Sequence, residues 1–251
     1  MTLRTQDCEI IAFVGLAVVF ETWERLRPAR AIDRWHDLKT DLLSFVFALV
    51  VNRLCTYSLS SFCREAAPAF VLASLHRVQA LPSVIKIFIA LLVVDFVIYW
   101  IHRAQHRFDC FWRTHAWHHS IERLYWFSGF RTSFLHSLIY NIPQVFIPIL
   151  VFKLSPAEAA IGYSIGVLIQ FWEHTNITVN IGSLSWLLIT PDYHRVHHST
   201  AHSRSNFGTT FSLWDRMFGT YLDPASVPIT SPLGLGEELE YKKVPRMLVG
   251  V

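Results

Sequence analysis

Charged residues are scarce in this sequence, and their scarcity excludes several classes of protein. Only 16% of the residues are Asp, Glu, Lys or Arg, whereas 52% are hydrophobic. Soluble domains usually carry about 25% charged residues. The net charge is only +3, and no basic stripe with interleaved aromatic residues is present. The composition therefore argues against a nucleic-acid-binding protein and predicts an integral membrane protein.

Cysteine is also scarce, and its spacing gives no sign of a thiolate metal site. The four cysteines, Cys8, Cys55, Cys63 and Cys110, form no C-x-x-C pair. We expect reduced thiols that fill apolar space, Cys110 included, and no disulfide framework. The sequence also lacks H-E-x-x-H, the motif in which zinc hydrolases place a glutamate base beside two ligands.

A cleavable signal peptide is not evident at the N-terminus. Asp7 and Glu9 precede the first apolar run, and that run ends in FETWERLRP without a small-residue cleavage site. We therefore expect the first apolar segment to be retained.

Histidine, by contrast, is abundant, and eight of the thirteen histidines fall in three short boxes. The boxes are HRAQHR (102–107), HAWHH (115–119) and HRVHH (194–198). Positions i, i+3 and i+4 share one face of a helix, so each box can direct its imidazoles into one shared space. Imidazole is the commonest protein metal ligand, and eight ligands exceed the needs of one ion. The boxes predict a two-metal centre built from His102, His106, His115, His118, His119, His194, His197 and His198.

The hydrophobic runs predict an all-α integral membrane fold. Four or five transmembrane or re-entrant helices are expected from the apolar stretches 10–20, 42–62, 83–101, 133–153 and 157–173. Asn52 and Arg53 interrupt the second stretch, and we expect both to face the protein interior or a polar cavity. Residues 102–131 are too charged to cross lipid, so they form a polar helical cap that carries the histidines.

Basic residues indicate the orientation of the cap. They concentrate in the connector 24–41 and again in 102–131. Short loops rich in Lys and Arg usually face the cytosol. If both segments do so, the second and third boxes lie on the same side, which predicts a metal site facing the cytosol.

The motifs, in their order along residues 85–222, resemble the fatty acid hydroxylase and sterol desaturase superfamily of membrane non-haem di-iron oxygenases. The matching segments are DFVIYWIHRAQH, FWRTHAWHHS, QFWEHTNI, TPDYHRVHHS and NFGTTFSLWDRMFGTY. The third and fourth are most similar to the sterol desaturase-like and alkylglycerol monooxygenase-like branches.

The resemblance implies an enzyme that binds two iron ions and uses O2 to hydroxylate or desaturate a lipid, whether fatty acyl, sterol-like or ether lipid. It adds a ninth ligand, His174, to the eight histidines of the boxes. No cytochrome b5-like segment is present, so electrons are expected from a separate reductase, ferredoxin or cytochrome b5-like protein. The membrane would be the inner membrane in a bacterium or the endoplasmic reticulum in a eukaryote.

The resemblance also suggests a division of the chain. We expect N-terminal membrane helices and connectors in 1–82, a catalytic domain in 83–222 and a C-terminal surface tail in 223–251. Many relatives carry Arg-x-His-Pro-x-Glu after the second box. Here Ser133 stands in place of the His and His136 in place of the Glu. His136 is a compensating ligand, a polar group of the substrate channel or a buried helix residue.

Other polar residues near the boxes have open roles. The sequence does not decide whether His202 joins the site. Asp95, seven residues before His102, shares its helix face and either supports an imidazole or is a paired structural acid. Glu173, Asp192 and Asp215 are further acids with the same two possible roles.

Two other functions compete with the oxygenase. A membrane zinc hydrolase would need a glutamate base beside its ligands. A metal transporter or non-catalytic metal-binding protein would place its ligands along a path through the bilayer, whereas these boxes lie outside the expected spans.

Overall fold

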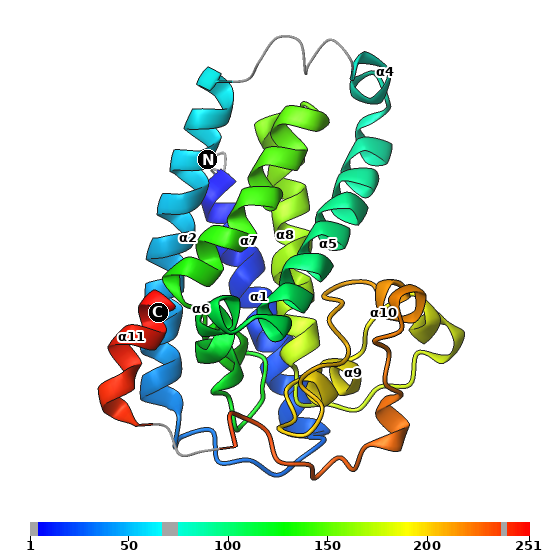
Figure 1. Cartoon of the computed structure of the whole chain (residues 1–251). Helices are drawn as coiled ribbons and strands as arrows, with labels where there is room; N and C mark the ends of the chain where they lie inside the picture. Colours follow the sequence, from blue (N-terminus) through cyan, green and yellow to red (C-terminus); the bar gives the residue numbers. More distant parts are fainter. Residues whose placement is uncertain (1–4, 67–74, 237–239) are drawn as a thin grey trace.

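The computed structural model describes residues 5–66, 75–236 and 240–251, and this part of the chain is helical, with isolated β-bridges but no strand. Long helices form a bundle (Figure 1), and shorter elements form a cap at one end of it. The bundle contains α1 (Thr5–Leu26), α2 (Leu38–Ala66), α5 (Ser83–Arg107), α7 (Phe134–Phe146) and α8 (Pro156–His174). The principal cap helices are α6 (Asp109–His119), α9 (Pro191–His197), α10 (Leu213–Phe218) and α11 (Val244–Val249).

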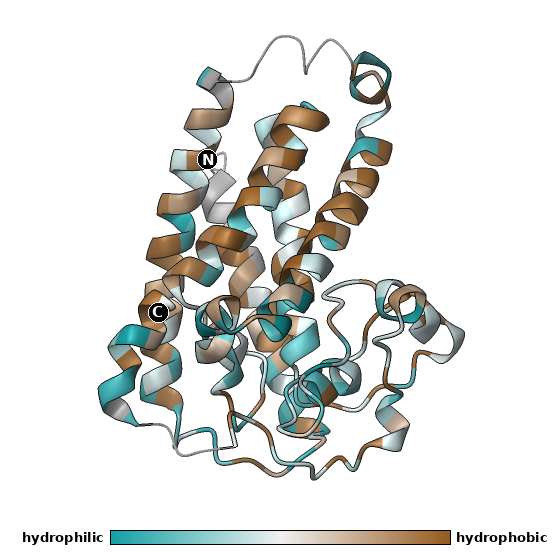
Figure 2. Cartoon of the chain, viewed as in Figure 1, coloured by the Kyte–Doolittle hydropathy of each residue, from teal (hydrophilic) through white to brown (hydrophobic). Residues whose placement is uncertain are grey.

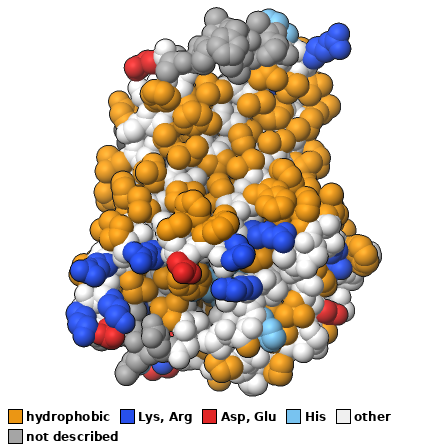
Figure 3. All heavy atoms as spheres, viewed as in Figure 1, with side chains coloured by type: hydrophobic (Ala, Val, Ile, Leu, Met, Phe, Trp, Pro, Cys, Tyr) orange, Lys and Arg blue, Asp and Glu red, His pale blue; other side chains and the backbone are white. Residues whose placement is uncertain are grey.

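Three helical segments are long and apolar enough to cross a membrane, namely Arg34–Cys63, Ser83–Arg107 and Phe134–Val151. Hydrophobic residues follow the length of the bundle and polar residues gather in the cap (Figure 2). In the space-filling view, apolar side chains cover the visible face of the bundle, and Lys and Arg side chains lie along the lower border of this apolar surface (Figure 3). This arrangement matches a membrane protein whose cap lies in water beside the headgroups.

The prolines of the bundle lie where the helices begin or change geometry. Pro82 is the N-cap of α5, and Pro156 is the first residue of α8, after the N-cap Ser155, which forms a capping box with Glu158. Pro143 lies inside α7, which continues into the π-helical turn η2 (Ile147–Val151). Pro143 thus lies just before the change from α-helical to π-helical geometry, and Pro156 lies at the start of α8.

The two polar residues of the second apolar stretch behave differently. Asn52 meets Asn141 of α7, whose Nδ2 donates to Asn52 Oδ1 over 2.7 Å. Arg53 is exposed on the outside of α2, so the expectation that it faces the interior is wrong. The buried stripe of α2 passes through Val51 and Cys55, and Arg53 lies on the opposite side of the helix.

Two smaller expectations also need correction. Cys110 is exposed at the start of α6 and does not fill apolar space, unlike the buried Cys55 and Cys63. The region 223–251, expected to be a surface tail, contains α11, which packs against α6 and α7.

Short elements connect the larger ones. α4 (His76–Gln79) precedes α5 at the end of the bundle away from the cap. Within the cap, the 3-10 turns are η1 (Ser128–Phe130), η3 (Gly182–Trp186), η4 (Pro224–Ser226) and η5 (Tyr241–Lys243).

Candidate metal centre

The three boxes lie at helix ends that meet where the bundle joins the cap. α5 continues through the first box, the chain extends at Phe108, and α6 returns with the second box. α8 ends at His174. The third box lies on α9, which begins with a Thr190 N-cap and Pro191, and ends with His198 as its C-cap. All nine histidines are at most 6% exposed.

The nine histidines form two adjacent groups rather than one. The first contains His102, His106, His115, His119 and His197, and the second contains His118, His174, His194 and His198. Within each group, one nitrogen of every ring lies within 4.8 Å of the corresponding nitrogen of every other. Both groups are therefore able to bind a metal ion.

Each H-x-x-H-H box divides between the two groups. The rings of the neighbours His118 and His119 lie at 84° to each other, and those of His197 and His198 at 85°. Successive helical residues point about 100° apart, so the two adjacent histidines of a box reach different groups. The boxes thus share one region, as predicted, but supply two positions within it.

In the second group, Nε2 atoms converge. The distance from His194 Nε2 is 3.1 Å to His174 Nε2 and 3.0 Å to His198 Nε2. His118 Nε2 lies 3.1 Å from His198 Nε2 and 3.3 Å from His174 Nε2. In the first group, His115 Nε2 lies 3.0 Å from His102 Nε2.

The hydrogen-bond partners of the Nδ1 atoms show which ring nitrogens carry hydrogen. His118 Nδ1 lies 3.2 Å from the carbonyl oxygen of Arg131, and His174 Nδ1 lies 2.9 Å from that of Gln170. A carbonyl only accepts, so both Nδ1 atoms carry hydrogen. In the neutral rings, both Nε2 atoms then present lone pairs to each other across 3.3 Å. Neither can donate to the other, and a cation between them would satisfy both.

Burial keeps the imidazoles of the cap neutral. Desolvation, reinforced by the neighbouring histidines, holds the pKa values of six of them well below their usual range, namely His115, His118, His119, His194, His197 and His198. The neutral ring is the form that binds metals.

Main-chain carbonyls of the cap hold two histidines of the first group. His102 Nδ1 meets the carbonyl oxygen of Phe207 and His197 Nδ1 that of Ser205, each over 2.8 Å. Asp215 fixes this loop, because its carboxylate accepts from the backbone N–H groups of Phe207 and Gly208, each over 2.8 Å. Sequence reasoning did not find these carbonyls, since any residue type can supply one.

The four candidate acids have different surroundings. Asp95 accepts from Thr209, Thr210, Phe211 and Trp214, so it fixes the loop before α10 and does not support an imidazole. Asp192 pairs with Arg195, and Asp215 fixes the loop at Phe207. Glu173 alone of the four lies beside the rings, 3.5 Å from His174 Nδ1 and 3.8 Å from His194 Nδ1.

Two histidines outside the predicted ligand set differ in position. His202 belongs to neither group. His136 is buried on α7, and its Nδ1 lies 3.0 Å from His115 Nδ1. It therefore contacts a member of the first group from behind without joining that group.

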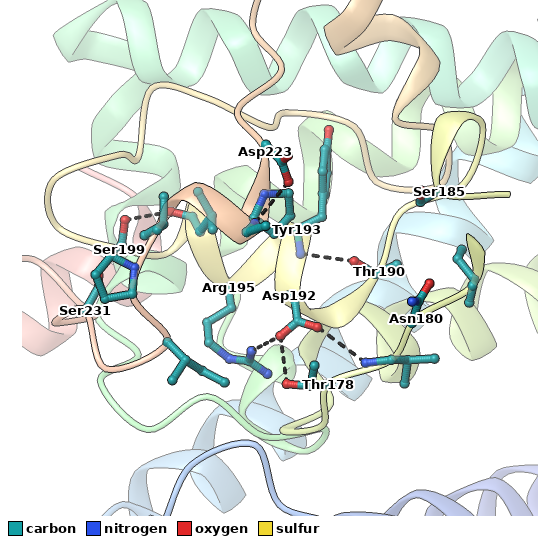
Figure 4. A pocket seen from close by; sticks show the side chains of 18 of the residues that line it. Thr178, Asn180, Ser185, Thr190, Asp192, Tyr193, Arg195, Ser199, Asp223 and Ser231 are labelled. Atoms are coloured by element: carbon teal, nitrogen blue, oxygen red, sulfur yellow. Dashed lines mark hydrogen bonds and ion pairs between the residues drawn. The ribbon is translucent and has the colours of Figure 1, made fainter. Parts of the chain in front are cut away.

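A cavity of about 390 Å³ lies on the other side of α9, and none of the nine histidines lines it. Figure 4 shows its polar wall, where Asp192 accepts from Arg195 and from Thr178. Asp223 also lines the cavity, and its carboxylate accepts from the backbone N–H of Ala225 over 3.0 Å.

A sequence model of the family described as fatty acid hydroxylase matches residues 87–220. The chain belongs to the fatty acid hydroxylase family. The match contains all nine histidines of the two groups, and it confirms the resemblance drawn from the boxes.

Named relatives are lipid-oxidising enzymes. The chain is 37% identical over 134 residues to an alkylglycerol monooxygenase of Xenopus tropicalis, which covers 51% of this chain and 29% of that protein. It is 26% identical over 234 residues to an ornithine lipid hydroxylase of Rhizobium tropici, covering 90% of this chain and 70% of the relative. With human lathosterol oxidase it shares 29% identity over 165 residues, covering 62% and 51%. The chain thus spans under a third of the first of these relatives. No solved structure matches it.

Proposed function

We propose that this protein is a membrane-bound di-iron oxygenase that uses O2 to hydroxylate or desaturate a lipid. The observation that carries the proposal is the pair of Nε2 lone pairs that face each other between His118 and His174. The family and the names of its relatives support oxidation of a lipid as the reaction.

The distances between the nitrogens fit metal ions. Metal–imidazole bonds are about 2.0–2.1 Å long, so two ligands at a right angle on one ion lie about 3.0 Å apart and two at a tetrahedral angle about 3.4 Å. The facing nitrogens of the second group are 3.0–3.3 Å apart. In the proposal, one iron is held by His102, His106, His115, His119 and His197, and the other by His118, His174, His194 and His198.

Iron suits this ligand set and this reaction. Imidazole binds iron well, and the two groups contain no thiolate that oxygen would attack. Bound there, two reduced irons would provide the electrons for O2 activation that oxidation of an unactivated C–H bond requires. The chain's own contribution is to bind the metals, fix the imidazoles through carbonyls such as Phe207 O, and keep water out of a fully buried site.

In the proposal, the lipid reaches this site through the bundle. We infer that α1 and α8 complete a set of four or five spanning or re-entrant helices around the three apolar segments. The histidines lie at the cap end of that bundle, and the Lys and Arg side chains along its border (Figure 3) support a cytosolic position for this end. A lipid tail would approach from the bilayer, and a separate electron-donor protein would approach the cap from the cytosol.

The test combines metal analysis with product analysis. Protein produced with iron-57 and purified in detergent should contain about two irons per chain by elemental analysis and Mössbauer spectroscopy. With a reductant, O2 and extracted membrane lipids, mass spectrometry should find a lipid that has gained one oxygen or lost two hydrogens. The variant His118→Ala is the inactive control.

Two results would count against the proposal. One is protein that fails to bind ferrous iron after reconstitution, since zinc alone can reflect displacement during overexpression. The other is iron-loaded protein that consumes no O2 with any reductant and lipid. A zinc hydrolase or a metal-binding protein without catalysis would then explain the histidines better.

A further inference from the structure

The outer nitrogen of His115 has a different partner from those of its neighbours. In four of the nine histidines, Nδ1 forms a hydrogen bond with a main-chain carbonyl: His102, His118, His174 and His197. His115 Nδ1 instead faces His136 Nδ1 over 3.0 Å. Among the nine, this is the one outer nitrogen with a side-chain hydrogen-bond partner.

We propose that His136 is a positioning residue for His115. Its Nδ1 accepts the hydrogen of His115 Nδ1, so His115 keeps its Nε2 lone pair for the metal of the first group. The inference rests on the proposed function, because it requires a metal in that group. It excludes His136 as a ligand, since the nitrogen that approaches the group is the one that accepts from His115.

A chain of hydrogen bonds fixes the direction of this contact. The hydroxyl of Thr114 donates to the carbonyl of Phe111 over 2.7 Å, so its oxygen accepts from Gln105 Nε2 over 2.9 Å. The same amide nitrogen lies 3.3 Å from His136 Nδ1 and can only donate. His136 Nδ1 therefore carries no hydrogen, and His115 must be the donor in the shorter contact between the rings.

Hydrogen bonds of Ser133 fix the position of His136 relative to His115. Ser133 is the N-cap of α7, and its Oγ accepts from the backbone N–H of His136 over 3.1 Å. The same hydroxyl donates to the carbonyl of Thr114 over 2.6 Å. Thr114 immediately precedes His115, so Ser133 ties the first turn of α7 to the backbone beside the ligand. Ser133 and His136 are the two residues that differ from the family pattern, and Ser133 thus positions His136.

The chemistry of residue 136 can be separated from its bulk. Asparagine attaches its Oδ1 to Cγ, as histidine attaches Nδ1, so His136→Asn keeps an acceptor at the same place. His136→Leu removes the acceptor, and His136→Phe removes it while keeping a planar ring. The control is His76→Leu, the same change at an exposed position on α4.

The experiment titrates the purified full-length protein in detergent with Co²⁺ alone, under anaerobic conditions, followed by ligand-field absorption and metal counting. Wild type should fill both groups. In His136→Leu and His136→Phe, the affinity of one group should fall about 10–100-fold, the usual effect of removing a hydrogen-bond partner behind a ligand. The other group should be unchanged, and His136→Asn and His76→Leu should bind as wild type does.

Each alternative outcome has a distinct meaning. Wild-type affinity at both groups in His136→Phe overturns the positioning role and leaves the proposed function intact. An equal loss in His136→Asn also overturns it, because an acceptor would then not be what matters. Failure of the wild-type protein to bind Co²⁺ at either group overturns the proposed function and this inference with it.

Discussion

The bundle and the cap place their polar and apolar side chains in opposite ways. The outer surface of the bundle exposes large apolar side chains such as Val46, Leu54 and Phe88, whereas the interior of the cap buries imidazoles and carboxylates. Apolar side chains on the outside of the bundle are stable in contact with lipid. Each polar group buried in the cap, by contrast, needs a hydrogen-bond partner. The comparison teaches that the cap depends on specific polar contacts and the bundle on general apolar packing. Substitutions should therefore cost most in the cap, less where the two regions join, and least inside the bundle.

The largest effect is expected at the centre of the cap. His118→Ala removes a nitrogen that faces both His174 and His198. Changes behind a ligand already cost about 10–100-fold, so loss of the imidazole itself should lower lipid oxidation by more than about 100-fold. Product formation and metal content are measured together. The control is His202→Ala, the same change just beyond the third box, which should leave product formation and metal content near wild type. A similar loss in His202→Ala would show that the effect is not specific to the histidines of the two groups.

The next effect concerns the contact between cap and bundle. Arg131 Nε donates to Asp41 Oδ1 of α2 over 2.5 Å, and both side chains are buried. Asp41→Ala removes the nearer carboxylate and leaves the guanidinium only the 3.6 Å ion pair with Asp37, so it should lower the free energy of unfolding by about 3–5 kcal/mol.

This prediction has a second arm. The double variant Asp41→Leu with Arg131→Met leaves no unpaired charge and should recover most of that loss. Unfolding by sodium dodecyl sulfate in mixed micelles measures both. The Arg131 carbonyl meets His118 Nδ1, so Asp41→Ala should also weaken metal binding. Equal stability of Asp41→Ala and wild type would contradict the dependence on polar contacts.

A smaller effect is expected at Asp95, inside α5 but bonded to the cap. Its carboxylate accepts from Thr209 Oγ1 over 2.7 Å and from Trp214 Nε1 over 2.8 Å. Asp95→Asn places an amide N–H against some of these donors and should cost about 1–3 kcal/mol of stability. Metal content should stay at the wild-type level, because Asp95 does not contact a histidine of either group. The exposed Asp109→Asn is the matched control, and loss of metal in Asp95→Asn would return Asp95 to the role of imidazole partner.

The sequence predicted the long helices and the convergence of the histidine boxes, because both follow from the period of a helix. The spacing of the boxes placed His102 and His106 on one helix face, and apolar runs placed the long helices. It did not predict contacts made by backbone carbonyls, such as Phe207 O on His102, because no residue type marks them. Spacing alone did not select His174, which entered only through the family resemblance. Arg53 was misplaced because hydrophobicity gives the depth of a residue but not the side of the helix.

The smallest effect is expected inside the bundle, where the same kind of polar contact should matter least. Asn141 of α7 donates to Asn52 over 2.7 Å and accepts from Thr56 over 2.9 Å, both on α2. Hydrogen bonds between membrane helices average about 0.6 kcal/mol, since the separated helices find other partners, so Asn141→Leu should cost about 1 kcal/mol. Ser58→Leu, on the exposed face of α2, is the control and should cost nothing measurable. If Asn141→Leu instead matched Asp41→Ala in the detergent unfolding assay, the bundle would depend on its polar contacts as strongly as the cap, and the contrast between the two regions would fail.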